Sequence, residues 1–96
     1  MKIGKRLQLP HGGFGVIMNN GVRIGNDAII FQNVTLGNGS VTIGDRVYIG
    51  AGAVLIGDIT IGDDVHIGAN TFVNFDVPDN STVVGVKGKI LKREST

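Results

Sequence analysis

The amino-acid sequence predicts an all-β fold in which short strands coil into a solenoid, and three observations support this prediction. An aliphatic side chain recurs about every six residues, at what we term the first repeat position: Met18, Ile24, Ile30, Leu36, Ile43, Ile49, Leu55, Ile61, Ile67 and Val73. Small or β-branched residues lie four places later, at the fifth repeat position: Val22, Ala28, Val34, Val47, Ala53, Ile59, Val65, Thr71 and Val77. The positions between them are mostly glycine, asparagine, aspartate and alanine, and the 96 residues include sixteen glycines.

A period of six fits neither a helix nor a plain two-sided strand. An α-helix repeats every 3.6 residues, and a glycine at every sixth place would cost it ~1 kcal/mol each time. Glycine, asparagine and aspartate adopt left-handed backbone conformations at low cost, so they let the chain turn every six residues. The aliphatic positions then stack into one continuous core, in which each coil contacts only its neighbours. One residue is inserted into the repeat, around residues 38–40.

Residues 1–96 are expected to form a single domain, with coils over about 6–84 and a basic tail over 85–96. The core must be aliphatic, because 42% of the residues are hydrophobic but only 5% are aromatic. The chain has no cysteine, which excludes disulfides, thiolate metal ligands and a cysteine nucleophile. It has no apolar run near the ~20 residues of a membrane span and no signal-peptide pattern, so we expect a cytoplasmic protein without membrane contact.

Charge is unevenly distributed, although the net charge is only +1. Residues 24–86 hold seven aspartates and a single arginine, Arg46. Most of the other basic residues gather at the two ends of the chain: Lys2, Lys5, Arg6, Lys87, Lys89, Lys92 and Arg93. These basic runs lack interleaved aromatic residues and the centre is acidic, so no nucleic-acid partner is expected.

Three stretches of the sequence resemble a known family. Residues 9–37 read LPHGGFGVIMNNGVRIGNDAIIFQNVTLG, residues 43–62 read IGDRVYIGAGAVLIGDITIG, and residues 76–90 read DVPDNSTVVGVKGKI. In these stretches the chain resembles the hexapeptide-repeat acyltransferases, most closely the serine O-acetyltransferases and the related polysaccharide O-acetyltransferases. The resemblance implies a left-handed parallel β-helix of triangular section with three hexapeptides per coil. It also implies acetyl-CoA as co-substrate and assembly as a homotrimer.

His11 is the candidate catalytic residue, and it begins a cluster that contains Gly12, Gly13 and Gly15. The resemblance implies that it is a general base at a coil corner, facing a cleft between two subunits. Such a base takes the proton from an acceptor hydroxyl and contributes ~10²–10⁴-fold in rate. The glycines would let substrate approach the backbone, whose N–H groups could stabilise an oxyanion. The alternative is a structural histidine in a glycine-rich corner, which the residues alone slightly favour, whereas the resemblance favours catalysis.

The resemblance also implies a coenzyme A groove held largely by main chain. The matching positions are Gly37, Ala51, Gly52 and Ala69, and Lys89 stands where the family often has a basic residue near the terminal phosphate. Small side chains at these places suit a shallow groove. Each of these residues has an equally simple interpretation as a turn residue of the solenoid.

The chain departs from the serine acetyltransferases in four places. Those enzymes pair the histidine with a carboxylate about one coil upstream, which falls before Met1, and their long loop after T-L-G corresponds to only residues 38–41 in this chain. Their N-terminal helical domain has no counterpart, and residues 2–7 already read as the middle of a coil, so we expect a version that lacks the N-terminal part of the family. The ending at residues 85–89 lacks the family's proline. Serine and a saccharide therefore remain alternative acceptors.

We expect an acetyl-CoA-dependent O-acetyltransferase of the serine acetyltransferase type, acting on a small hydroxyl acceptor and using no metal. A γ-class carbonic anhydrase shares the β-helix but needs three histidines on zinc. This chain has only His11 and His66, and His66 is expected to be a solvated surface residue. A catalytically silent solenoid with a role in assembly is the remaining alternative, which the missing carboxylate supports and the retained His11 with its glycines opposes.

Overall fold

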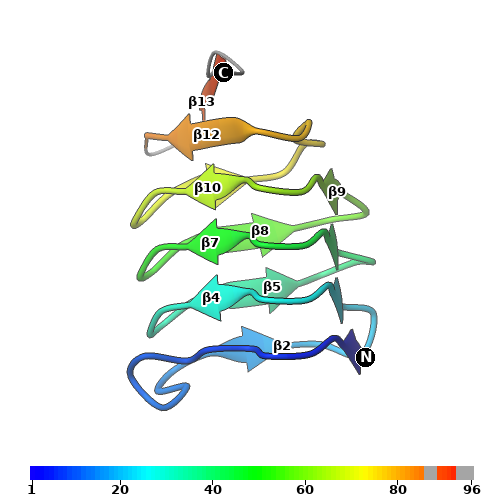
Figure 1. The fold of residues 1–96 in the computed structure, drawn as a ribbon, viewed down its shortest axis with the longest axis vertical. Helices are drawn as coiled ribbons and strands as arrows, with labels where there is room; N and C mark the ends of the chain where they lie inside the picture. The colour runs from blue at the N-terminus through cyan, green and yellow to red at the C-terminus, as the bar shows by residue number, and fades with distance from the viewer. Residues whose placement is uncertain (86–88, 93–96) are drawn as a thin grey trace.

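The computed structural model describes residues 1–85 and 89–92, which form thirteen short strands and no helix (Figure 1). The strands make three sheets, which we name A, B and C. Sheet A contains β1 (Lys2–Ile3), β3 (Arg23–Ile24), β6 (Thr42–Ile43) and β9 (Thr60–Ile61). Sheet B contains β4 (Ile29–Ile30), β7 (Tyr48–Ile49), β10 (His66–Ile67), β12 (Ser81–Val84) and β13 (Lys89–Lys92). Sheet C contains β2 (Ile17–Met18), β5 (Thr35–Gly37), β8 (Val54–Ile56) and β11 (Phe72–Val73).

Strands that neighbour one another within a sheet are parallel and come from successive coils, except that β13 returns antiparallel to β12. In Figure 1 the chain climbs from the N-terminal coil, passing leftwards along sheet B in front and rightwards along sheet C behind, which is a left-handed winding. The left-handed parallel β-helix expected from the resemblance is therefore confirmed. Of the expected basic tail at 85–96, residues 86–88 and 93–96 lie outside the described residues. Within the described part, no helix of a length and apolarity suited to crossing a membrane occurs.

The core of the solenoid is built from the repeat positions. A two-residue strand points one side chain outwards and the next inwards, and the inward ones meet across the three sheets. All first-position residues from Ile24 to Val73 are buried, and only Met18, in the first coil, is partly exposed. All fifth-position residues are buried as well. The sequence repeat is thus confirmed as the pattern of the core.

Coil length varies although the strands stay in register. Ile43 and Ile61 are paired at a separation of 18 residues, the length of three hexapeptides. Ile24 and Ile43 are 19 residues apart, Ile3 and Ile24 are 21 apart, and Ile61 and Val77 are 16 apart. The differences are therefore accommodated at the corners of the triangle, and the strands keep their pairing.

The inserted residue falls where the sequence predicts it, at 38–40. Because of the insertion, Val41 rather than Ser40 takes the buried position in this corner. Gly39 adopts a φ of 149°, and a Cβ there would lie 2.5 Å from the carbonyl carbon of Gly57 in the next coil. Only glycine fits this position, since other residues rarely adopt that φ and a Cβ would overlap the neighbouring backbone.

Val77 lies in a different place from the one that the repeat predicts. The period of six puts it at a fifth position, four residues after Val73. In the structure it forms a bridge with Ile61 and so occupies a first position of sheet A. The chain turns the preceding corner with two residues fewer than a full hexapeptide, and the Asp76 side chain accepts the Thr60 N–H at 2.8 Å across that corner. Val77 is nevertheless buried, as predicted.

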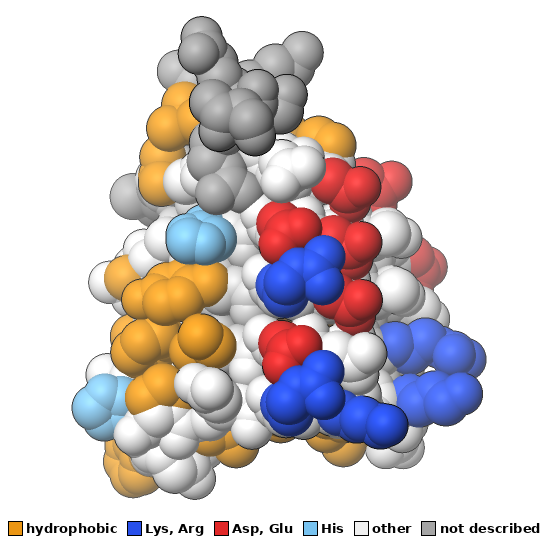
Figure 2. Space-filling model, viewed as in Figure 1, with side chains coloured by type: hydrophobic (Ala, Val, Ile, Leu, Met, Phe, Trp, Pro, Cys, Tyr) orange, Lys and Arg blue, Asp and Glu red, His pale blue; other side chains and the backbone are white. Residues whose placement is uncertain are grey.

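The corner between sheets A and B carries a ladder of polar and charged residues, which we term the corner ladder (Figure 2). Its members have φ values of 57° to 61°: Arg6, Asp27, Arg46, Asp64 and Asn80. The residue directly before each of the last four members has a side-chain oxygen that accepts a hydrogen bond from a backbone N–H of the preceding coil, at 2.7–2.8 Å. These residues are Asn26, Asp45, Asp63 and Asp79. Arginine is unexpected in a left-handed conformation. Both arginines are ion-paired to the next coil, Arg6 with Asp27 at 2.5 Å and Arg46 with Asp64 at 2.8 Å.

The Arg6–Asp27 pair predicts a small dependence of stability on pH. The side-chain hydrogen bond from Arg6 lowers the pKa of Asp27 from its ordinary value of 3.8. A lowered carboxylate pKa contributes stability that is present above the ordinary value and is lost as the pH falls through the lowered one. We expect Asp27→Asn to melt slightly below the wild type near pH ~7, with the gap closing on acidification and in high salt, since the pair is exposed. A gap in Tm that persists unchanged at low pH would contradict this role.

Candidate functional site

The corner between sheets B and C (the B–C corner) holds His11 in an enlarged loop. Residues 10–15 form consecutive turns, which add three residues to the first coil and project from it at the lower left of Figure 1. The turns are closed by backbone hydrogen bonds, among them Gly12 N–H to Leu9 O at 2.8 Å and Asn33 N–H to Phe14 O at 2.9 Å. The glycines at 12, 13 and 15 have φ of 68°, 80° and 68°, which explains the glycine cluster of the sequence.

The His11 imidazole is exposed and chemically available. Its ring centroid lies 6.2 Å from that of Phe31, with the rings tilted by 46°. Within the described residues, neither ring nitrogen makes a hydrogen bond, so both can exchange a proton with a bound molecule. Gly15 places the loop against the next coil, where a Cβ would overlap the Oδ1 atom of Asn33. The backbone of the loop that carries His11 is therefore packed closely against the next coil.

Three of the predicted coenzyme residues lie on the same corner, in the coils above His11. Gly52 N–H donates to Gln32 O at 3.0 Å and Asn70 N–H donates to Ala51 O at 2.8 Å, so these corners stack in successive coils. Ala51 and Gly52 are partly exposed and Ala69 is exposed. The structure thus brings His11, Ala51, Gly52 and Ala69 into one column whose small side chains leave the main chain accessible.

Gly37 and Lys89 are placed elsewhere. Gly37 ends β5 at the opposite edge of sheet C, where it is buried and a Cβ would lie 3.1 Å from Asn19 Nδ2. Within one chain it does not share the column that contains His11. Lys89 begins β13, where its backbone pairs with that of Val84, but its side chain lies outside the described residues.

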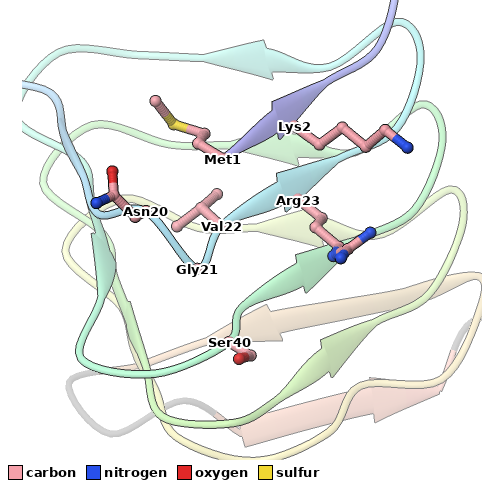
Figure 3. A pocket seen from close by; sticks show the side chains of 7 residues that line it. All are labelled: Met1, Lys2, Asn20, Gly21, Val22, Arg23 and Ser40. Atoms are coloured by element: carbon pink, nitrogen blue, oxygen red, sulfur yellow. The ribbon is translucent and has the colours of Figure 1, made fainter.

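Two surface hollows lie on other parts of the solenoid. One, of about 400 Å³, lies where the first coil borders sheet A, and in Figure 3 Lys2 and Arg23 extend in the same direction from β1 and β3. Its lining residues are Met1, Lys2, Asn20, Gly21, Val22, Arg23 and Ser40. The second, of about 500 Å³, is lined by Thr60, Gly62, Asp76, Val77, Pro78 and Asp79. Neither hollow is lined by a residue of the His11 column.

Two features near the B–C corner were not predicted from the sequence. Tyr48 and His66 are neighbouring outward residues of sheet B, and the Tyr48 ring also contacts that of Phe31, which directly follows β4. His66 is therefore exposed as predicted but also stacked on Tyr48. Their separation of 18 residues, the length of one coil, could have predicted that Tyr48 and His66 stack. Gln32 Oε1 is buried and has no hydrogen-bond partner in the part of the chain that the structure describes, which no sequence pattern indicates. No group of three or more His, Cys, Asp or Glu side chains suited to a metal ion occurs among the described residues.

The chain is similar in sequence and in fold to bacterial acetyltransferases. Residues 40–74 match the family described as bacterial transferase hexapeptide (six repeats). A serine acetyltransferase of Staphylococcus aureus (strain Mu50) is 45% identical over 97% of this chain and 46% of its own length. The crystal structure of Neisseria gonorrhoeae serine acetyltransferase superposes with a TM-score of 0.92 and 37% identity, over 99% of this chain and 40% of that one. A serine acetyltransferase in complex with CoA superposes with a TM-score of 0.89 and 38% identity, over 94% and 38% of the two chains.

The similarity covers nearly all of this chain but less than half of each relative. The chain spans about half the length of the curated relatives it matches. The matched part includes the B–C corner with His11 and the coils above it. The chain therefore carries the hexapeptide repeat of bacterial transferases at residues 40–74, and over nearly all of its length it is similar to serine acetyltransferases.

Proposed function

We propose that this chain is an acetyl-CoA-dependent O-acetyltransferase, with His11 as the general base. The observation that carries the proposal is the column on the B–C corner, which unites His11 with Ala51, Gly52 and Ala69. The small side chains of this column fit a main-chain groove for coenzyme A, and a solved relative is a complex with CoA. A reaction that uses acetyl-CoA also fits the cytoplasmic location expected from the sequence.

The loop at residues 10–15 supplies the groups that acyl transfer needs. His11 would accept the proton of the acceptor hydroxyl as its oxygen attacks an acyl carbonyl, and would then return that proton to the leaving sulfur. Acetyl-CoA supplies the acyl thioester in this reaction. Among the described residues, the backbone N–H groups of Gly13 and Gly15 donate no hydrogen bond, so they are free to stabilise a tetrahedral oxyanion.

The position of Gly37 supports a trimer with the site between copies. The outward row on sheet C is Ile17, Thr35, Val54 and Phe72, and Ile17 is 62% exposed. Packing three copies through this row would cover it. The arrangement would bring the Gly37 edge of one copy towards the B–C corner of the next. Gly37 would then complete the groove from the neighbouring subunit, which explains why it is remote from the column within one chain.

The acceptor is serine or a saccharide. The similarity of the chain to serine acetyltransferases supports serine as the acceptor. Two features support a saccharide acceptor instead. The sequence resembles polysaccharide O-acetyltransferases, and a short corner at 38–41 stands in place of the long loop of the serine enzymes. A catalytically silent solenoid is the alternative function, and the observation that favours it is the His11 imidazole, which has no carboxylate partner among the described residues.

Calorimetric titration with CoA tests the proposal. We expect saturable binding near one site per chain, weakened at least ~10-fold by Ala51→Asp, because the added carboxylate would fill the groove and repel phosphate. Asn26→Asp is the matched control, since it adds the same group on the A–B corner, where aspartates already accept the same backbone hydrogen bond. A folded protein that binds no CoA at millimolar concentration would exclude the transferase and leave the silent solenoid.

A further inference from the structure

A row of aromatic rings lies on the outer face of sheet B and at its edge with the B–C corner, and the proposed reaction does not use it. Phe31, Tyr48 and His66, which we term the ring strip, come from three successive coils. Ring centroids are 5.1 Å apart between Phe31 and Tyr48 and 5.3 Å apart between Tyr48 and His66. Figure 2 shows hydrophobic side chains gathered on this face between the two histidines of the chain.

The ring strip begins at the candidate catalytic residue. His11 lies 6.2 Å from Phe31 between ring centroids, so four rings follow one another from the loop to the third coil of sheet B. A molecule that reaches His11 with one group can therefore lie along the strip with the remainder. Sheet B is also a different face from sheet C, whose apolar row we assign to contacts between copies.

The chemistry of the strip fits a neutral molecule that has both C–H and hydroxyl groups. The strip contains no Lys, Arg, Asp or Glu, and the neighbouring corner ladder satisfies its charges by ion pairs within itself. The Tyr48 hydroxyl, the His66 nitrogens and the hydroxyl of Thr82, which follows His66 in register, have no hydrogen-bond partner among the described residues. A sugar chain packs its C–H faces on aromatic rings and bonds to such groups through its hydroxyls.

Other partners fit less well. A stable protein–protein interface covers ~800 Å² on each partner, whereas the ring strip consists of only three side chains. A nucleic acid needs cations for its phosphates, and the ring strip contains no Lys or Arg. A free amino acid such as serine is too short to span three coils.

We propose that the ring strip binds the saccharide chain of the acceptor and presents one of its hydroxyls to His11. This inference rests on the proposed function and selects a saccharide over serine. The ring centroids are 5.1 and 5.3 Å apart, which is close to the length of one sugar unit in an extended chain. Phe31 then holds the sugar next to the reacting one, and Tyr48 and His66 hold those beyond.

Tyrosine fluorescence tests the inference without requiring turnover. Tyr48 is the single tyrosine and the chain has no tryptophan, so its emission reports on the strip alone. We expect saturable changes with at least one neutral tetrasaccharide from a panel of glucose, galactose and N-acetylglucosamine oligomers, and none with serine. Phe31→Leu and His66→Ala should weaken binding ~10-fold or more, whereas the matched change Phe75→Leu at another corner should not.

CoA titration of the same preparation separates the two proposals. Binding of CoA without any tetrasaccharide at ~10 mM would overturn the inference and leave the transferase intact. Binding of a tetrasaccharide without CoA would overturn the transferase, and with it the acceptor role of the strip. Equal loss of saccharide binding in Phe31→Leu and Phe75→Leu would also overturn the assignment to sheet B.

Discussion

Replacing His11 with alanine is expected to slow acetyl transfer by ~10²–10⁴-fold, the contribution of a well-placed general base. The reason is that the acceptor hydroxyl then has no group to take its proton, since within the described residues no other titratable side chain contacts the His11 ring. CoA affinity should be unchanged, because in the proposed groove Ala51, Gly52 and Ala69, and not His11, would contact the cofactor, through their main chain. The substitution therefore lowers kcat with little effect on the dissociation constant for CoA.

Release of the free CoA thiol is the suitable measurement, because the protein contains no cysteine and gives no background in a thiol assay. Lys5→Ala is the control, since Lys5 is exposed on the A–B corner and only its backbone is hydrogen-bonded there. A His11→Ala protein that retains transfer within a few-fold of the wild type would remove the histidine from the mechanism. A wild-type protein that binds CoA and transfers no acetyl group to any serine or saccharide acceptor would support the silent solenoid.

Replacing Ile43 with alanine is expected to lower the free energy of unfolding by ~2–5 kcal/mol. Ile43 is 2% exposed and stands between Ile24 and Ile61 in the stacked core of sheet A. Each coil is held only by its two neighbours, so the resulting cavity weakens both interfaces at once. For a chain of this size the loss corresponds to a fall in Tm of ~4–8 °C for each kcal/mol.

Thr42→Ala is the matched control, because Thr42 is the outward residue of the same strand, β6. It is expected to change stability by no more than ~0.5 kcal/mol, as surface substitutions usually do. Both variants and the wild type should be unfolded in denaturant at one protein concentration, since association of copies makes the apparent stability concentration-dependent. Equal destabilisation by Ile43→Ala and Thr42→Ala would contradict the assignment of inward and outward positions.

The sequence by itself determined which residues build the core and which one is the candidate base. A period of six is a local pattern, and the strands must all turn their aliphatic residues inwards because water is excluded only there. The glycine cluster beside His11 was also visible in the sequence, and the structure accounts for it by positive φ values at residues 12, 13 and 15. The insertion near residue 39 was visible as a break in the same period.

Only the tertiary structure decided how the coils meet. The short corner before Val77, the arginines of the corner ladder and the separation of Gly37 from Ala51 depend on contacts between residues 16 to 21 positions apart. The row of rings from His11 to His66 arises in the same way, because each ring comes from a different coil or loop. Stacking register is set by packing between coils and not by the local pattern within one, so the sequence shows the repeat but not which outward side chains become neighbours.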